Sequence, residues 1–440
     1  MTQPPAAEPL LEVRDLRTHF SLRGSFGQRL VGRESGSVKA VDGVSFELRR
    51  GEVLGLVGES GSGKTTLGRT VLGLAEPTSG SIRFEGQELV GRRERELRPL
   101  RKRMQMVFQD PHASLNPAMD LLTAVGHPLI VHGVVKRVRD TVPMVTNALE
   151  TVGLSPVEQF LPKYPGDLSG GQKQRAMLAR AIIMNPDLLV ADEPVSMLDM
   201  SVRAKILELM LELKSEFELT YLYITHDLAT AKFFCDTIAI MYLGRIVEYG
   251  PTETIFRDPK HPYTVALLGA VPDPDSSEGL PTDPPRGEVP DAAEPPLGCS
   301  FHPRCPRAFE RCGWDSRDLK DRLEARWAGM PESQFERERA VIGDIEALES
   351  PSQAAIIPAG KGHSGSEVSA LLDEMRKADP AEPTWSGIES TSVEPGGLRV
   401  RFRPPVEPRL GSRDGVDVAC LLYGESEPPG QDRLDSDRSV

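Results

Sequence analysis

The sequence has few of the features that mark membrane-spanning, secreted or nucleic-acid-binding proteins. No apolar run reaches the roughly 18 residues that a membrane-spanning helix needs, and the longest candidates, such as Thr237–Val247 with Gly244 and Arg245, are short and interrupted. The opening residues, MTQPPAAEPLLEVRD, lack the basic and apolar pattern of a secretory signal. Acidic residues outnumber basic ones by 65 to 52, which argues against nucleic acid as a partner. A cytoplasmic location is therefore predicted.

Cysteine is also scarce. The chain has five cysteines in 440 residues, too few and too unevenly spread for a disulfide framework. In a reducing compartment, clustered cysteines indicate a metal site before a disulfide, and four of the five follow residue 298. Cys235 lies in an apolar stretch between a predicted helix and a predicted strand, so we interpret it as a core residue.

Short apolar runs alternate with longer helical patterns from residue 10 to residue 250, which predicts an α/β domain with a largely parallel sheet. Several of these runs are apolar throughout, as expected of strands that are buried on both faces. The chain between Val71 and Asp187 is long enough for a helical insertion. The predicted strands are Val53–Val57, Met104–Phe108, Leu188–Ala191 and Tyr221–Thr225.

Three further regions follow this domain. Residues 251–298 are predicted to form a tail and linker, of which 271–297 are dense in Pro, Asp and Glu. Residues 299–440 are predicted to form a small, irregular extension that contains cysteines. Within it, residues 349–395 are rich in Ser, Pro, Gly and charge, so this stretch is predicted to be disordered.

The segment GESGSGKTT, Gly58 to Thr66, fits the P-loop pattern between an apolar strand and a helical pattern. Its glycines let backbone N–H groups and the helix start face a phosphate. Lys64 is predicted to reach the β- and γ-phosphates, and Thr65 to bind Mg²⁺. The alternative is a glycine-rich loop without a ligand. The predicted nucleotide-binding residues of this loop are Gly58, Ser60, Gly61, Gly63, Lys64, Thr65 and Thr66.

Polar side chains follow three of the predicted strands. LLVADEP ends in Asp192, which suits the Mg²⁺ shell, and Glu193, which suits a general base for an attacking water. Gln109 is placed to touch Mg²⁺ or that water, and His226 to bond the γ-phosphate and orient the base. Alone, each residue is more often a cap, a solvated turn or a structural residue. Together with the P-loop they indicate a site that hydrolyses a nucleotide.

LSGGQKQR, Leu168 to Arg175, predicts a second helix start that suits an anion, with Ser169 as its N-cap. The order of P-loop, Gln109, LSGGQ, ADEP, Leu198-Asp199 and His226 resembles the nucleotide-binding domains of ABC proteins over residues 10–250. This resemblance implies a P-loop NTPase core with a mixed sheet. It also implies a helical subdomain at about residues 112–187 that carries the signature motif.

The same resemblance implies that ATP is sandwiched between two subunits. The signature residues Ser169, Gly171 and Gln172 would then cap the γ-phosphate held by the opposing P-loop, and Asp199 would lie at the subunit interface. Phe20 stands where these proteins place an aromatic ring against adenine, although an ordinary core phenylalanine is the alternative.

Further segments resemble the ATPase subunits of oligopeptide and dipeptide importers: VFQDPHASLNP, TSG, MYLGRIVEYG and HPYTVALLGAVPDPD. This resemblance implies peptide uptake, a second and different ATPase subunit, two transmembrane permease subunits and an extracytoplasmic substrate-binding protein. It places the chain at the cytoplasmic face of the inner membrane as a peripheral subunit. Related subunits serve nickel and oligosaccharide importers, so these substrates stay open, and the direction of transport rests on the resemblance alone.

The cysteines Cys299, Cys305 and Cys312 do not follow zinc or ferredoxin spacing. In several peptide-importer ATPases, however, a segment similar to GCSFHPRCPRAFERC and a later VAC supply four thiolates to a four-iron four-sulfur cluster. The resemblance makes Cys420 the fourth ligand here, across an insertion that relatives keep much shorter. Free thiols are the alternative.

Two other classes of function were compared with the ATPase hypothesis. A regulatory subunit that senses nucleotide or redox state without turnover would be expected to lack Glu193 or His226, and both are present. A soluble ABC ATPase that acts on ribosomes or DNA would be expected to carry two nucleotide domains or a coiled-coil insertion, and the sequence has neither.

Overall fold

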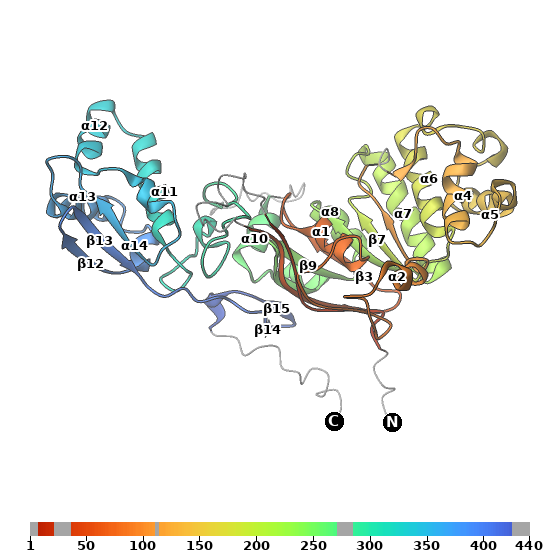
Figure 1. Ribbon diagram of the computed structural model, residues 1–440, viewed down its shortest axis with the longest axis horizontal. Helices are drawn as coiled ribbons and strands as arrows, with labels where there is room; N and C mark the ends of the chain where they lie inside the picture. The colour runs from red at the N-terminus through yellow and green to blue at the C-terminus, as the bar shows by residue number, and fades with distance from the viewer. Residues whose placement is uncertain (1–7, 22–36, 111–113, 271–284, 425–440) are drawn as a thin grey trace, which may run out of the picture. The chain divides into compact units, whose positions relative to one another are not determined.

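The computed structural model describes residues 8–21, 37–110, 114–270 and 285–424. The chain divides into two compact units, Met1–Pro259 and Lys260–Val440, and Figure 1 shows their elements. The boundary lies a few residues beyond the expected end of the nucleotide-binding domain, so most of the expected tail belongs to the second unit. Residues 271–284 of the predicted linker lie outside the described residues.

A central sheet in the first unit carries the predicted strands. Its order is β10-β9-β3-β8-β7-β6, and β9, β3, β8, β7 and β6 run parallel while β10 returns antiparallel. The strands β3, β7 and β8 are buried at every position, which explains their unbroken apolar sequences. The bounds are β3 Val53–Val57, β6 Met104–Val107, β7 Leu188–Asp192, β8 Thr220–Thr225, β9 Thr237–Tyr242 and β10 Arg245–Pro251.

A second, antiparallel sheet has the order β2-β1-β4-β5. Together the two sheets give the first unit the mixed α/β architecture that the sequence predicts. The bounds are β1 Leu11–Ser21, β2 Ser37–Leu48, β4 Ser79–Phe84 and β5 Gln87–Glu88.

Helices follow the strands and build a separate helical region. In Figure 1, α4, α5, α6 and α7 gather at one side of this unit. The helices α4, α5 and α6 pack on one another and match the predicted helical subdomain. The bounds are α1 Lys64–Val71, α2 Glu94–Arg101, α4 Leu121–Val131, α5 Val142–Thr151, α6 Gly170–Ile182, α7 Met200–Phe217, α8 Leu228–Phe234 and α9 Thr252–Arg257.

The second unit begins with α10 (Pro262–Gly269) and the cysteine segment, and it contains an inserted domain between Cys312 and Cys420. In this domain the helices α11, α12 and α13 accompany an antiparallel sheet of order β11-β13-β12. The bounds are α11 Ser316–Ala328, α12 Glu332–Val341, β11 Ala354–Pro358, α13 Gly365–Ala378, α14 Thr384–Gly387, β12 Ile388–Glu394, β13 Gly397–Phe402, β14 Gly411–Arg413 and β15 Val416–Val418.

The expectation of disorder over residues 349–395 is corrected here, because these residues form β11, α13, α14 and β12. Their apolar side chains are few but regularly spaced, and they join one buried core with Trp314, Leu319 and Phe402. Ile357 pairs with Leu398 across the sheet, and Ala355 pairs with Val400. The Ser-rich and Pro-rich composition therefore belongs to the surface of a folded domain.

The two ends of the inserted domain lie close together, beside Gly298. Cys299 N–H donates to the Cys312 carbonyl at 2.9 Å. A Cβ on Gly298 would lie 2.6 Å from that same oxygen and 3.1 Å from the Val406 carbonyl. Since the two ends meet, the cysteine segment and the later Cys420 can stay near each other despite the long insertion.

Across the parts of the chain that the structure describes, no helix combines the length and apolar character needed to span a bilayer.

Candidate nucleotide-binding and hydrolysis site

The loop between β3 and α1 closes tightly against neighbouring backbone. Gly63 precedes α1 with φ of 102°, a conformation that side chains other than hydrogen disfavour. A Cβ there would lie 1.9 Å from the carbonyl oxygen of Ala40 on β2. Only glycine therefore fits at this start of the helix.

Lys64 is almost fully buried inside this loop. Its Nζ donates to the carbonyl oxygens of Gly58 at 2.7 Å and Glu59 at 2.8 Å. Burial lowers the pKa of Lys64, while the carboxylates of Glu193 and Asp192 oppose that shift. The loop thus holds a cation among oxygen acceptors at the place where a phosphate would be bound.

Thr65 and Asp192 meet beside this loop. The Thr65 hydroxyl donates to Asp192 Oδ1 at 3.0 Å. Asp192 ends β7 and is 2% exposed, and burial raises its pKa. A hydroxyl and a carboxylate oxygen at this separation form a donor set that suits Mg²⁺, so these residues fit the metal that the sequence predicts.

Glu193 follows β7 in a left-handed backbone conformation with φ of 46°. Its N–H donates to the Ile224 carbonyl on the neighbouring strand β8 at 2.9 Å. Gln109 Nε2 donates to one carboxylate oxygen at 2.8 Å, and His226 Nδ1 lies 3.0 Å from the other. The three predicted strand ends therefore converge on one carboxylate, because β6, β7 and β8 are adjacent and parallel.

The environment of His226 includes an ion pair that sequence reasoning missed. Asp227 accepts hydrogen bonds from the N–H groups of Ala229 and Thr230 at the start of α8. Its other oxygen pairs with Arg203 of α7 at 2.8 Å. This pair ties the segment after β8 to α7 and fixes the backbone that carries His226. The acidic residue directly after His226 in the sequence is the feature that could have indicated this ion pair.

The signature segment forms a helix start, as predicted. Ser169 caps α6 and accepts from the Gln172 N–H at 3.3 Å, while its own N–H donates to Gln172 Oε1 at 3.0 Å. Ser169 and Gly170 are exposed. Asp199 caps α7, which packs beside α6, and accepts from the Val202 N–H at 3.0 Å. The Gln172 side chain is thus used for capping, a role that the sequence analysis did not assign.

Phe20 lies near the end of β1 with 48% of its surface exposed. It pairs with Val38 of β2, two residues before the Ala40 that contacts the P-loop glycine. The alternative of a core phenylalanine is therefore wrong, whereas its contact with adenine stays a prediction.

Four cysteines of the second unit line one small cavity: Cys299, Cys305, Cys312 and Cys420. Burial raises the pKa of Cys305 to about 12 and that of Cys312 to about 11. Among the described residues, no three His, Cys, Asp or Glu side chains form a group suited to a metal ion. The iron-sulfur cluster therefore stays a prediction. Cys235 is buried beside Gly55 of β3, in agreement with its interpretation as a core residue.

Family models match both parts of this arrangement. The model described as ABC transporter matches residues 41–196, and the one described as oligopeptide/dipeptide transporter, C-terminal region, matches residues 247–312. The fold and the site define an ATPase of the ABC class. The second match, over residues 247–312, places this ATPase among the subunits of oligopeptide and dipeptide transporters.

Curated relatives agree with both matches. The oligopeptide transport ATP-binding protein AppF of Bacillus subtilis (strain 168) is 46% identical over 308 residues, which cover 69% of this chain and 92% of that protein. The putative peptide import ATP-binding protein BOV_A0347 of Brucella ovis is 43% identical over 313 residues, 71% of this chain and 94% of that protein. The chain belongs to the family of ATP-binding subunits of oligopeptide and dipeptide ABC transporters.

Proposed function

We propose that this chain binds MgATP at its P-loop and hydrolyses it with Glu193 as the general base, and that this hydrolysis drives peptide uptake. The observation that carries the proposal is the placement of Glu193. Its carboxylate is held by Gln109 and His226. Asp192, which accepts a hydrogen bond from Thr65, directly precedes it at the end of β7. This is the set of groups that phosphoryl transfer to water needs.

Each group would have a distinct task. The backbone N–H groups of the P-loop and the Lys64 ammonium would neutralise the β- and γ-phosphates. Thr65, Asp192 and Gln109 would hold Mg²⁺, which screens the charge that develops on the phosphate oxygens. The exposed ring of Phe20 would stack on adenine.

Glu193 would accept a proton from the attacking water. Its left-handed backbone and its bond to Ile224 fix the direction in which the side chain leaves β7. His226 contacts the carboxylate through Nδ1, which orients the ring and leaves Nε2 as the atom for the γ-phosphate. A non-hydrolytic sensor is not favoured, since a base and its two orienting partners are all in contact.

A second ATPase subunit, different from this chain, would complete the site. Its P-loop would receive the exposed helix start at Ser169, Gly171 and Gln172, with Asp199 at the interface. An anion at this helix start is favoured by the free N–H groups and the helix dipole. Gln172 would leave its capping bond to Ser169 to reach the γ-phosphate.

Further partners are two transmembrane permease subunits and an extracytoplasmic binding protein, with this chain at the cytoplasmic face of the inner membrane. The names of the relatives, which refer to peptide import and oligopeptide transport, support peptides over nickel or oligosaccharides. The test is to isolate the complex from membranes, identify its chains, and measure uptake of labelled peptides. Co-isolation with chains other than permeases, or uptake of nickel alone, would refute the assignment.

His226→Ala is expected to lower ATP turnover by about 100-fold, because Glu193 loses one of its two orienting partners and the γ-phosphate loses a donor. ATP hydrolysis by the purified complex under saturating ATP measures this. His19→Ala is a matched control, since His19 contacts the carboxylate of Asp42 at 3.2 Å on another sheet. Equal turnover in the two variants would remove His226 from the mechanism.

We also propose that the cysteine cavity holds a four-iron four-sulfur cluster. The four cysteines that line the cavity are a soft donor set of the kind that such clusters require. Burial raises the pKa of the Cys305 and Cys312 thiols, so a bound metal would have to supply the positive charge that keeps them ionised. When bound, such a cluster supplies a centre that takes up or gives one electron.

Protein purified without oxygen is expected to contain iron and acid-labile sulfide in equal amounts, and Cys312→Ser to lose most of both. Cys235→Ser, which changes a buried cysteine of the first unit, is expected to keep them. Metal and sulfide analysis of the three proteins is the measurement. Zinc without sulfide, or no metal in the wild-type protein, would contradict the cluster.

A further inference from the structure

The ring of His302 is enclosed between the cysteine segment and the first helix of the inserted domain. Its Nδ1 lies 2.8 Å from the Cys299 carbonyl oxygen, and its Nε2 lies 3.1 Å from Asp318 Oδ1 on α11. The His302 side chain is 0% exposed and the Asp318 side chain 8%. Trp314 packs edge-on against the ring, with 4.7 Å between centroids.

Both partners of this ring are oxygen atoms. The Cys299 carbonyl can only accept, so Nδ1 donates to it, while Nε2 faces the Asp318 carboxyl group. The ring thus bridges the cysteine segment and α11. The same carboxylate accepts from the Asp315 N–H at 2.7 Å through its other oxygen and so completes the cap of α11. One buried carboxylate thus anchors both the helix start and the cysteine segment.

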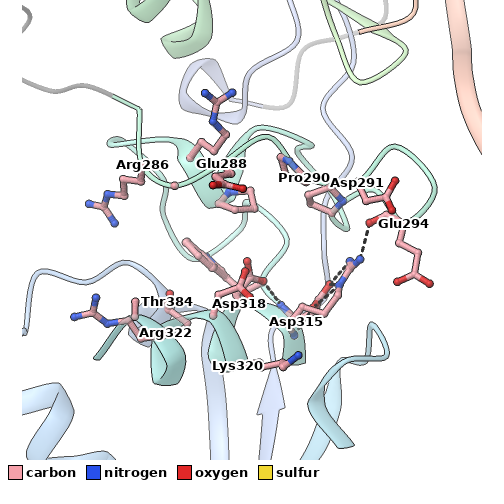
Figure 2. Close-up of a pocket in the computed structure, with 18 of the residues that line it drawn as sticks. Arg286, Glu288, Pro290, Asp291, Glu294, Asp315, Asp318, Lys320, Arg322 and Thr384 are labelled. Carbon is pink, nitrogen blue, oxygen red and sulfur yellow. Dashed lines mark hydrogen bonds and ion pairs between the residues drawn. The ribbon is translucent and has the colours of Figure 1, made fainter. Parts of the chain in front are cut away.

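The members of this pair line different cavities. His302 lines the small cavity of the four cysteines. Its partners Asp318 and Trp314 line a second pocket of about 630 Å³. Figure 2 shows this pocket between the loop that carries Arg286 to Glu294 and the segment that carries Asp315 to Arg322, with Asp318 facing into it.

We propose that His302 and Asp318 are positioning residues that couple the inserted domain to the cysteine cavity. The helix α11 holds His302 through Asp318, and His302 holds the Cys299 carbonyl, from which the chain runs on to Cys305. A change at the pocket that moves α11 therefore alters access to the thiols, and a change at the thiols in turn affects α11. The proposal is independent of the ATP site and of whether a cluster is bound.

Asp318→Asn tests this coupling with almost no change of shape. An amide has one acceptor oxygen where the carboxyl group has two, so residue 318 can no longer place an oxygen against both the Asp315 N–H and His302 Nε2. In the reduced full-length protein, freed of metal by a chelator, iodoacetamide is expected to modify Cys299 about tenfold faster than in the wild type. Timed mass spectrometry of the modified peptides gives the rate for each cysteine.

Glu367→Gln is a matched control. Glu367 occupies the same capping position at the start of α13 and also contacts a histidine, His363, at 2.9 Å, but it lines neither cavity. The Cys299 rate is expected to stay at its wild-type value in this variant, and Cys235 serves as an internal standard for unfolding. His302→Gln is a second variant and is expected to accelerate Cys299 in the same way.

Three outcomes would overturn the proposal. The first is a wild-type Cys299 rate in both Asp318→Asn and His302→Gln. The second is an equal increase for Cys299 and Cys235, which would mean general unfolding. The third is an equal increase in the control Glu367→Gln, which would mean that any lost cap in this domain exposes the thiols.

Discussion

Glu193→Gln is expected to lower ATP turnover about a thousandfold while ATP binding is retained. The amide keeps the shape of the side chain and can still bond Gln109 and His226, but it cannot accept a proton from water at neutral pH. General base catalysis contributes about 100- to 10,000-fold in enzymes. The residues that we propose to hold the nucleotide, Lys64, Thr65 and Asp192, are unchanged. Steady-state hydrolysis and equilibrium binding of labelled ATP measure the two effects separately.

Glu208→Gln is the control for this variant, since Glu208 is an exposed acid on the neighbouring helix α7. It is expected to hydrolyse ATP at the wild-type rate. If Glu193→Gln also kept that rate, Glu193 would not be the base. If it lost ATP binding along with turnover, its role would be in holding the nucleotide.

Lys64→Ala is expected to weaken ATP binding by at least about 100-fold. The ammonium would contact two phosphates, and each hydrogen bond to a charged group contributes about 1.5–3 kcal/mol. Folding is not expected to suffer, because burial already lowers the pKa of Lys64 and its removal relieves that cost. Binding of a labelled ATP analogue, together with the thermal unfolding temperature, measures both effects.

Lys205→Ala, at an exposed position on α7, is the matched control and is expected to bind ATP normally. Wild-type affinity in Lys64→Ala would contradict the placement of the phosphates at this loop. A large fall in the unfolding temperature would instead mean that Lys64 serves the fold.

The strands, and the convergence of the polar side chains that follow them, could be predicted from the sequence. The runs Val53–Val57 and Leu188–Asp192 are apolar throughout because both faces of the sheet are covered. Since parallel strands end at one edge, polar residues that follow adjacent strands must meet there. The local sequence of Ser169 to Gln172 likewise specifies a capped helix, and the structure forms one.

The inserted domain could not be predicted in the same way. Its strands are short, and β11 pairs with β13 about forty residues later in the chain, so no local pattern shows the pairing. Ser, Pro and Gly dominate the composition and conceal the buried alternation of Ala355 and Ile357. The contact of His302 with Asp318 joins the cysteine segment to α11, and the motif in the cysteine segment does not indicate this partner. Such contacts depend on how elements are brought together, which one sequence does not display.

The central claim is that hydrolysis at Glu193 powers peptide uptake. The most direct measurement is the uptake of a labelled oligopeptide by vesicles that contain the isolated complex, with ATP supplied at the face that carries this chain. The account predicts uptake that depends on ATP and Mg²⁺ and that falls with turnover in Glu193→Gln. Uptake that continued in Glu193→Gln at the wild-type rate, or wild-type ATP hydrolysis without any peptide uptake, would contradict it.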